Sequence, residues 1–339
     1  MMEAYRLNKF KGTPREIGIA IGESIGDRFV ENVDRFISYT DDIYGLDFDK
    51  LEREAMSWFR NLPVEYQKEL EGIAIGSSCS IEKLGQWYYC DRCFDGGCTS
   101  FITEIDGDFW LGRNNDYIFP EFWGYITILE VDNKIPVMLF GLEGSTFSGT
   151  GYNAEKLWIH YNWLPVWDIP PRSQDVLAPF VFLRLALESC KTIDEVEQLL
   201  RMTSRDGGMN LFVVDGKTNQ AAVFEATCQH YRRRDMQNGD IAAANHYCKV
   251  KLPEGLEYDF SGSMARQTRV ETLLAGKEKI TIPDSLIKIL ADPAVEQDSK
   301  YSGTVYSNIV CPAKDQMWYA HNGYPAASQS DWEKVNWKW

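Results

Sequence analysis

The residue pattern of this 339-residue chain changes abruptly at the DGG tripeptide of residues 95–97, and this change constrains the fold more than any other feature. Upstream of it, apolar residues recur at helical spacing, and Thr13 with Glu16 forms a capping-box start signal. Downstream, alternating runs are joined by turn dipeptides such as Asp106-Gly107, which is typical of β-hairpins. Hairpins with helices between them predict antiparallel sheets layered with helices, an α+β fold.

We divide the chain at this point into a mainly helical segment, 1–97, and a sheet-rich segment, 98–339. Helical spacing in the first segment runs without interruption from residue 13 to about residue 39, and three further helices are predicted before residue 95. The second segment returns to helix at about 175–203 and 263–275. No repeat and no Gly/Ser linker separates further domains.

The formal net charge of −15 disfavours non-specific binding to nucleic acid or to an anionic membrane, because both need a positive surface. The one compact basic run, 232–234, is interpreted as a solvated strand end or turn, and a site for a phosphate-bearing acyl donor is the alternative. No apolar run approaches the roughly 18 residues of a membrane span. The amino terminus lacks a signal-peptide pattern, so we expect a soluble, cytoplasmic protein.

Eight cysteines in a chain without a secretion signal are expected to be mostly reduced thiols. Cys90 and Cys93 have the CxxC spacing of zinc ligands. However, no second pair stands at zinc-site spacing, and no histidine lies near them in the sequence. We therefore expect no metal, and interpret the pair as two structural thiols on a helix.

Cys98 stands after two glycines at the head of a predicted strand, on backbone that another group can approach closely. Its thiol could attack the Gly97 carbonyl in an N→S acyl shift, and hydrolysis of the thioester would release Cys98 as a new amino terminus. A free α-amine has a reference pKa of ~7.7–8.0, against ~8.5 for a thiol. Such an amine can serve as the base for the thiol, so that no histidine is needed.

Eight stretches of the chain follow one another in the order found in a known family. They are GTPREIGIAIGE (12–23), ELEGIAIGSSCS (69–80), GCTS (97–100), GRNNDY (112–117), GYNAEKLWIHYNWLP (151–165), GGMNLFVVD (207–215), ANHY (244–247) and SMARQTR (263–269). With them the sequence resembles the acyl-coenzyme A:6-aminopenicillanic acid acyltransferase family. That family belongs to the choloylglycine hydrolase and penicillin V acylase group of N-terminal-nucleophile hydrolases.

The resemblance covers nearly the whole chain and implies a four-layer αββα sandwich with a helical prosegment. It also implies a zymogen that cuts itself between Gly97 and Cys98 and remains a heterodimer of its own two fragments. Assembly into a homo-oligomer is left open. The implied activity is that of a cysteine amidohydrolase or acyltransferase working through a Cys98 acyl-enzyme.

Catalytic roles follow from the resemblance residue by residue. Asp116 would hydrogen-bond the freed α-amine, and Arg113 would favour the thiolate through its positive charge. From the residues alone, this pair could equally be an ordinary hairpin ion pair. Arg266 would complete the charge network, with Arg269 in support, and the alternative for Arg266 is a helix-surface cation.

Two asparagines are implied to lie near the reacting carbonyl. Asn162 is the expected oxyanion-hole donor, with a neighbouring backbone N–H as the second donor, and Asn245 is the second asparagine. The stretch before Asn162 lacks a glycine usual in the family, so Asn153 stays an alternative. Position 115 is Asn where the family has an apolar residue, which makes the strand near the nucleophile more polar.

Four aromatic residues cluster around the predicted oxyanion segment: Tyr152, Tyr161, Trp163 and Trp167. We expect them to line a pocket for an aromatic or apolar acyl group, with a role in the core as the alternative. The predicted substrate is a small amide or thioester, such as an N-acyl amino acid, a β-lactam side chain or another natural-product amide. No cofactor is expected, and acyl-coenzyme A remains open as a co-substrate.

Two other functions remain open at this point. One is a Cys-His hydrolase that acts without self-cleavage, with His246 as the base. The other is a catalytically silent relative that binds a small molecule or a partner.

Overall fold

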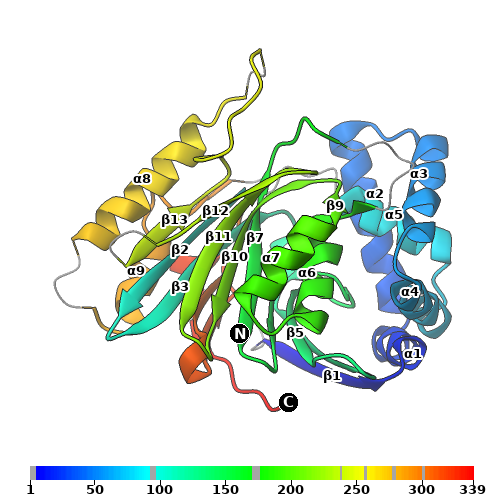
Figure 1. Cartoon of the computed structure of the whole chain (residues 1–339). Coiled ribbons are helices and arrows are strands. Elements are labelled where there is room, and N and C mark those ends of the chain that lie inside the picture. Colours follow the sequence, from blue (N-terminus) through cyan, green and yellow to red (C-terminus); the bar gives the residue numbers. More distant parts are fainter. Residues whose placement is uncertain are drawn as a thin grey trace.

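A computed structural model describes residues 5–91, 97–169, 176–236, 239–255, 258–276, 280–299 and 302–339. Two β-sheets form its centre (Figure 1). The eight-stranded sheet has the order β1 (Arg6–Gly12), β4 (Tyr125–Val131), β5 (Val137–Gly141), β6 (Thr150–Asn153), β7 (Leu157–Leu164), β10 (Gly208–Asp215), β11 (Gln220–Ala226), β12 (Tyr231–Arg234). The six-stranded sheet has the order β13 (Asp240–Ala243), β2 (Gly97–Ile105), β3 (Asp108–Tyr117), β14 (Gly303–Cys311), β15 (Gln316–Ala320), β16 (Glu333–Lys334). A two-stranded sheet joins β8 (Val176–Leu177) to β9 (Ser204–Arg205).

Helices cover the outer face of each sheet. Their bounds are α1 (Pro14–Ile25), α2 (Asp27–Tyr44), α3 (Phe48–Arg60), α4 (Val64–Ser77), α5 (Ile81–Asp91), α6 (Pro179–Ser189), α7 (Ile193–Met202), α8 (Ser261–Ala275), α9 (Asp284–Leu290) and α10 (Ala326–Gln329). Helices α6 and α7 lie on the eight-stranded sheet, α1–α5 gather beside them, and α8 and α9 lie on the six-stranded sheet (Figure 1). No helix in the described ranges is both long and apolar enough to cross a bilayer.

Three apolar clusters account for this layering. One fills the space between the sheets, where Phe140, Trp158 and Phe212 are fully buried. A second joins the eight-stranded sheet to its helices, and a third packs Phe101 and Ile309 against the two helices on the other side. Since each sheet is buried on both faces, the layer order is αββα. The predicted α+β class and four-layer sandwich are confirmed.

The helical start signals of the first segment are confirmed in part. Thr13 caps α1, and Glu16 completes the capping box. The single helix predicted from residue 13 to about 39 is wrong, because Gly26 breaks it with φ +60° and ψ −139° and starts α2 at the next residue. A residue with a Cβ adopts this conformation only under strain.

The first segment also contains a strand that the helical prediction missed. Residues 6–12 form β1, which pairs in parallel with β4 at the edge of the eight-stranded sheet. Lys9 and Lys11, two residues apart, both pair with Glu130, which is a charged pattern typical of an edge strand. Half-exposed edge strands carry little apolar periodicity, so their sequence signal is weak. As a result, segment 1–97 supplies part of the same sheet and core as the rest of the chain.

Helices α1 and α4 pack through glycines. Gly18 and Gly22 of α1 face Gly72 and Gly76 of α4. A Cβ built on Gly18 would lie 2.0 Å from the Glu69 carbonyl oxygen, so the two backbones are in direct contact. The glycines of the GIAIGE and GIAIGS motifs therefore permit a close helix–helix crossing.

We expect Gly18→Ala to lower the free energy of unfolding by about 2–3 kcal/mol, because backbone atoms must move to admit the methyl group. Gly85→Ala is the matched control, since its Cβ would meet Ala55 only at 3.6 Å or more. That variant should be neutral or up to about 1 kcal/mol more stable, because alanine favours the helix. Urea unfolding of both variants checks this, and equal stabilities would contradict the packing.

Candidate active site

Cys98 is the second residue of β2 and pairs across the ladder with Asn115 of β3. It is 5% exposed and lies in the wall of a cavity of about 160 Å³. Gly97, before it, pairs with Asp116. Both residues of the predicted cleavage junction therefore belong to the ladder, and residues 92–96 lie outside the described part of the chain.

Arg113 lies beside the thiol. Its Nη2 is 3.3 Å from Cys98 Sγ and donates to Asn115 Oδ1 at 2.7 Å and to the Tyr161 carbonyl at 2.9 Å. It is 1% exposed, yet no carboxylate forms an ion pair with it within the described parts of the chain. A buried cation without a counter-ion is costly. Negative charge on the sulfur would lie closest to it.

Asn245 and Arg266 lie next to the backbone of Cys98. Asn245 Oδ1 accepts from the Cys98 backbone N–H at 2.9 Å and from Arg266 Nη2 at 2.7 Å. Arg266 Nε also donates to Thr99 Oγ1 at 2.9 Å. Arg266 follows Ser263 by three residues on α8, so one helix face carries both. Ser263 Oγ accepts from the Asn245 backbone N–H at 2.7 Å.

Asp116 is a buried carboxyl with one oxygen in use. Its Oδ1 accepts from Thr304 Oγ1 at 2.7 Å, while Oδ2 is buried without a partner in the described chain. Burial raises its pKa to about 6, although the nearby Arg266 charge and the Thr304 hydrogen bond lower it in part. This Oδ2 lies close to Gly97, since a Cβ atom added to that glycine would be only 3.1 Å from it. An acceptor without a partner in the described chain therefore lies next to the junction.

The geometry does not support Asn162 as a donor to an oxyanion. Its Nδ2 already donates to the Ala243 and Ala244 carbonyls, at 3.0 and 3.4 Å, and its Oδ1 accepts from Ser100 Oγ. A flipped amide would place oxygen against two carbonyls, so this orientation is fixed. Strand alternation explains the difference, because Asn162 points between the sheets while its neighbours on β7 face the cavity.

Asn153 is not an alternative either, because its side chain is used in the turn between β6 and β7. Nδ2 donates to the Leu187 and Cys190 carbonyls, and Oδ1 accepts from the backbone of Glu155 and Leu157.

Two of the four predicted pocket aromatics line the cavity, Tyr161 and Trp163. The other two predictions are wrong. Tyr152 is buried between the sheets, where its hydroxyl donates to Asp315 Oδ1 at 2.6 Å. Trp167 packs against Tyr247, away from the cavity. Closeness in sequence to the site placed all four together, but side chains on one strand alternate between its two faces.

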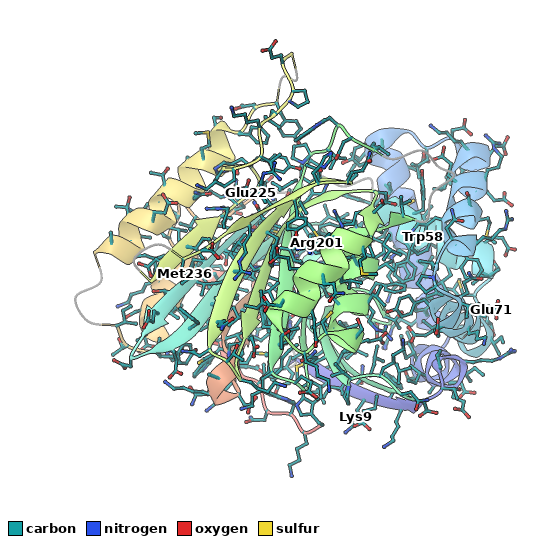
Figure 2. All side chains as sticks on the ribbon, viewed as in Figure 1. Lys9, Trp58, Glu71, Arg201, Glu225 and Met236 are labelled. Carbon is teal, nitrogen blue, oxygen red and sulfur yellow. The ribbon has the colours of Figure 1, made fainter. Side chains whose placement is uncertain are left out.

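Other aromatic residues complete the cavity, and the sequence analysis missed them. Trp87 and Tyr88 come from α5, in the segment before the nucleophile, and Phe147 and Phe180 come from beyond it. These side chains continue into an aromatic cluster around Trp58 of α3, which lies among the helices on the right of the view in Figure 2. The only hint in the sequence was the aromatic run QWYYC (86–90). No local pattern indicates that this run contacts a loop far away in the sequence.

The remaining candidates lie elsewhere. His246 Nδ1 is 2.8 Å from Ser263 Oγ and its Nε2 is 3.7 Å from Cys248 Sγ, and it does not line the cavity. Burial lowers its pKa, and the Arg234 charge adds to this. Arg269 forms a surface ion pair with Asp292.

The basic run 232–234 forms the edge strand β12, where Arg233 and Arg234 pair with Glu197 and Glu225. Figure 2 marks Glu225 on the neighbouring strand β11. Cys93 lies outside the described residues, and within them no group of three or more His, Cys, Asp or Glu side chains could hold a metal ion.

A family model for acyl-coenzyme A:6-aminopenicillanic acid acyl-transferase matches residues 102–324, well over half of the chain. The chain belongs to this family. The predicted resemblance is thus confirmed, and family membership supports an amidohydrolase or acyltransferase of the N-terminal-nucleophile type. Comparison with functionally curated proteins gives no match.

Solved structures with a similar fold are remote in sequence. A conjugated bile acid hydrolase variant from Clostridium perfringens is 14% identical, with a TM-score of 0.48 over 71% of this chain and 97% of that one. An N-acylethanolamine-hydrolyzing acid amidase ortholog from Caenorhabditis elegans is 14% identical, with a TM-score of 0.49 over 64% and 93% of the two chains. A penicillin V acylase from Agrobacterium tumefaciens is 11% identical, with a TM-score of 0.49 over 70% and 86%.

We expect the buried Asp116 carboxyl to lower the free energy of unfolding at neutral pH. A carboxyl whose pKa rises from an ordinary 3.8 to about 6 on folding binds its proton more tightly in the native state. The free energy of unfolding should therefore fall as the pH rises from about 4 to about 6, and stay low above that. Asp116→Asn should remove this dependence and be more stable at pH 8, by about 3 kcal/mol at most. Denaturant titrations at several pH values check it in the Cys98→Ala background, where no new amine forms beside Asp116. Parallel curves with and without Asp116→Asn would contradict it.

Proposed function

We propose that this chain is a self-processing cysteine amidohydrolase or acyltransferase, in which Cys98 is the nucleophile and its freed α-amine is the base. The main support is that three polar side chains lie next to Cys98 and the peptide bond before it. Arg113 Nη2 lies 3.3 Å from the sulfur, Asn245 Oδ1 binds the nitrogen at 2.9 Å, and the unpartnered Asp116 Oδ2 lies beside Gly97. A cysteine in an ordinary core would need none of these polar neighbours.

The first step is cleavage of the chain. Cys98 Sγ attacks the Gly97 carbonyl carbon, the peptide C–N bond breaks, and the Cys98 nitrogen takes up a proton. Water then hydrolyses the thioester, which leaves a carboxylate on Gly97 and a free thiol and amine on Cys98. Asn245, which binds the Cys98 nitrogen, and Asp116, which lies beside Gly97, would then bind the new amine and keep it next to the sulfur.

In turnover, the α-amine accepts the thiol proton as Sγ attacks the carbonyl of a bound amide. The tetrahedral intermediate collapses, the amine leaves with a proton, and the acyl group stays on Cys98 as a thioester. Water or a second amine then takes the acyl group and restores the thiol. Arg113 supplies positive charge where the sulfur is negative.

The two fragments would remain one molecule after cleavage. β1 pairs with β4 in the eight-stranded sheet, and buried Arg184 of α6 donates to both carboxylate oxygens of Glu69 on α4, at 3.1 and 3.0 Å. Such a buried pair strongly opposes separation, because either partner alone would be an uncompensated buried charge. These contacts support a heterodimer of fragments 1–97 and 98–339.

The cavity supports an aromatic or apolar acyl group on a small amide or thioester. Aromatic side chains surround it, while polar groups such as Arg113 and Asn115 gather near Cys98. Acyl-coenzyme A, which the family name specifies, remains a proposed co-substrate.

Intact-mass analysis tests the proposal directly. The wild-type protein should give two fragments, 1–97 and 98–339, whereas Cys98→Ala should remain one chain and release no product from an acyl p-nitroanilide. The alternative Cys-His hydrolase predicts an uncut chain that loses turnover in His246→Ala. A folded, active and uncut wild type would sink the self-processing mechanism.

The acyl preference should depend on Phe147, which lines the cavity next to Tyr88. We expect Phe147→Leu to lower kcat/KM for a phenylacetyl p-nitroanilide about tenfold more than for the acetyl compound, because the smaller side chain contacts the ring less. Phe48→Leu, on the exposed face of α3, is the control and should change neither. Equal losses for the two substrates would place the acyl group elsewhere.

A further inference from the structure

The oxyanion that forms in the proposed reaction needs hydrogen-bond donors near Cys98. The asparagine expected to supply one, Asn162, already donates its amide N–H groups to the carbonyls of Ala243 and Ala244. Asn245 turns its Nδ2 to the Trp163 carbonyl at 2.9 Å. Besides any backbone N–H, a donor from another side chain in the cavity wall could therefore bind the oxyanion.

Asn115 lies directly opposite Cys98 in the ladder of β2 and β3, so both side chains project from the same face. It lines the cavity and is 7% exposed. Its Oδ1 accepts from Arg113 Nη2 at 2.7 Å and faces Cys98 Sγ at 3.7 Å. A guanidinium can bind only the oxygen of an amide, so the orientation of this side chain is fixed.

That orientation leaves the two N–H bonds of Asn115 pointing away from Arg113. The hydrogen bonds of this side chain within the described part of the chain all involve Oδ1. The hydrogen bond from the guanidinium to Oδ1 polarises the amide and strengthens its N–H groups as donors. An amide of this kind, held in a buried wall beside a nucleophile, meets the requirements of an oxyanion-hole donor.

We propose that the Asn115 side-chain amide is a catalytic residue that donates a hydrogen bond to the oxyanion of the tetrahedral intermediate. This inference rests on the proposed function, with Cys98 as nucleophile. As the C–S bond forms, the carbonyl π electrons move to the oxygen, and an Asn115 N–H binds that charge. When the C=O bond re-forms, the amine leaves and the hydrogen bond weakens.

The test compares Asn115→Leu, which removes the donor at similar volume, with Asn115→Asp, which keeps an acceptor for Arg113 but has no N–H. The probe is the phenylacetyl p-nitroanilide. Both variants should lose about 100-fold in kcat. KM should change little in the Leu variant, because the interaction forms mainly in the transition state. A kcat for Asn115→Leu close to that of the wild type would overturn the proposal.

Alkylation of Cys98 by iodoacetamide separates this role from an effect on the thiol. That reaction displaces iodide at a saturated carbon and forms no oxyanion. Asn115→Leu should therefore react at the wild-type rate even though turnover is slow. If alkylation and turnover fall by the same factor, Asn115 acts on the sulfur and the proposal is wrong.

Two further measurements keep the result interpretable. Cys98→Ala, assayed in parallel, tests the proposed function itself: if it still turns over the anilide, the nucleophile is wrong, whatever Asn115 does. Phenylacetaldehyde gives a second readout, because its hemithioacetal with Cys98 has an oxygen where the oxyanion forms. Its inhibition constant should rise in Asn115→Leu, and an unchanged constant would contradict the assignment even if that variant is poorly active.

Discussion

The buried guanidinium of Arg113 is the contact on which the site depends. It comes from β3 of the six-stranded sheet and donates to two carbonyls of the other layer. Tyr161 belongs to β7 of the eight-stranded sheet, and Gly149 directly precedes β6 of the same sheet. The same group contacts the Cys98 sulfur and the Asn115 amide. One cation therefore links the two sheets at the point where Cys98 lies. Because its neighbours are neutral dipoles, its charge remains available to an anion that forms in the cavity.

The second constraint is that the segment before Cys98 is built into the fold. It provides an edge strand, a glycine-packed helix pair and two aromatic side chains of the cavity wall. Its Glu69 is the buried partner of Arg184, whose Nη1 also donates to the Thr146 carbonyl in the loop that carries Phe147. The shape of the acyl pocket thus depends on both sides of the 97/98 junction.

Local signals in the sequence predicted the local structure well. The capping box at Thr13 and the turn at Asp106-Gly107 are correct because each depends on a few neighbouring residues. Cys98, Arg113, Asn245 and Arg266 lie close together, and the order of the motifs carried information about these distant contacts.

The errors among the predicted site residues on strands have one physical origin, which is that a list of nearby residues does not say which face each occupies. Asn162 and Tyr152 are on the interior faces of their strands, whereas Tyr161 faces the cavity. Strand β1 and the contribution of Trp87 depend on partners more than 30 residues away, which periodicity cannot detect. In the sequence, Asn115 was notable only as a departure from the family pattern. It became a candidate donor because the amide of Asn162 is already hydrogen-bonded to two carbonyls.

The glycine contact between α1 and α4 has a consequence for any cut at residue 97. Both helices belong to the same side of that junction, so a cut there would leave their crossing untouched, together with the apolar residues Ile17, Leu70 and Ile73 that surround it. The shorter piece would keep a contact between two of its own helices. Substitutions in the aromatic lining on α5 would change the cavity and leave that crossing in place.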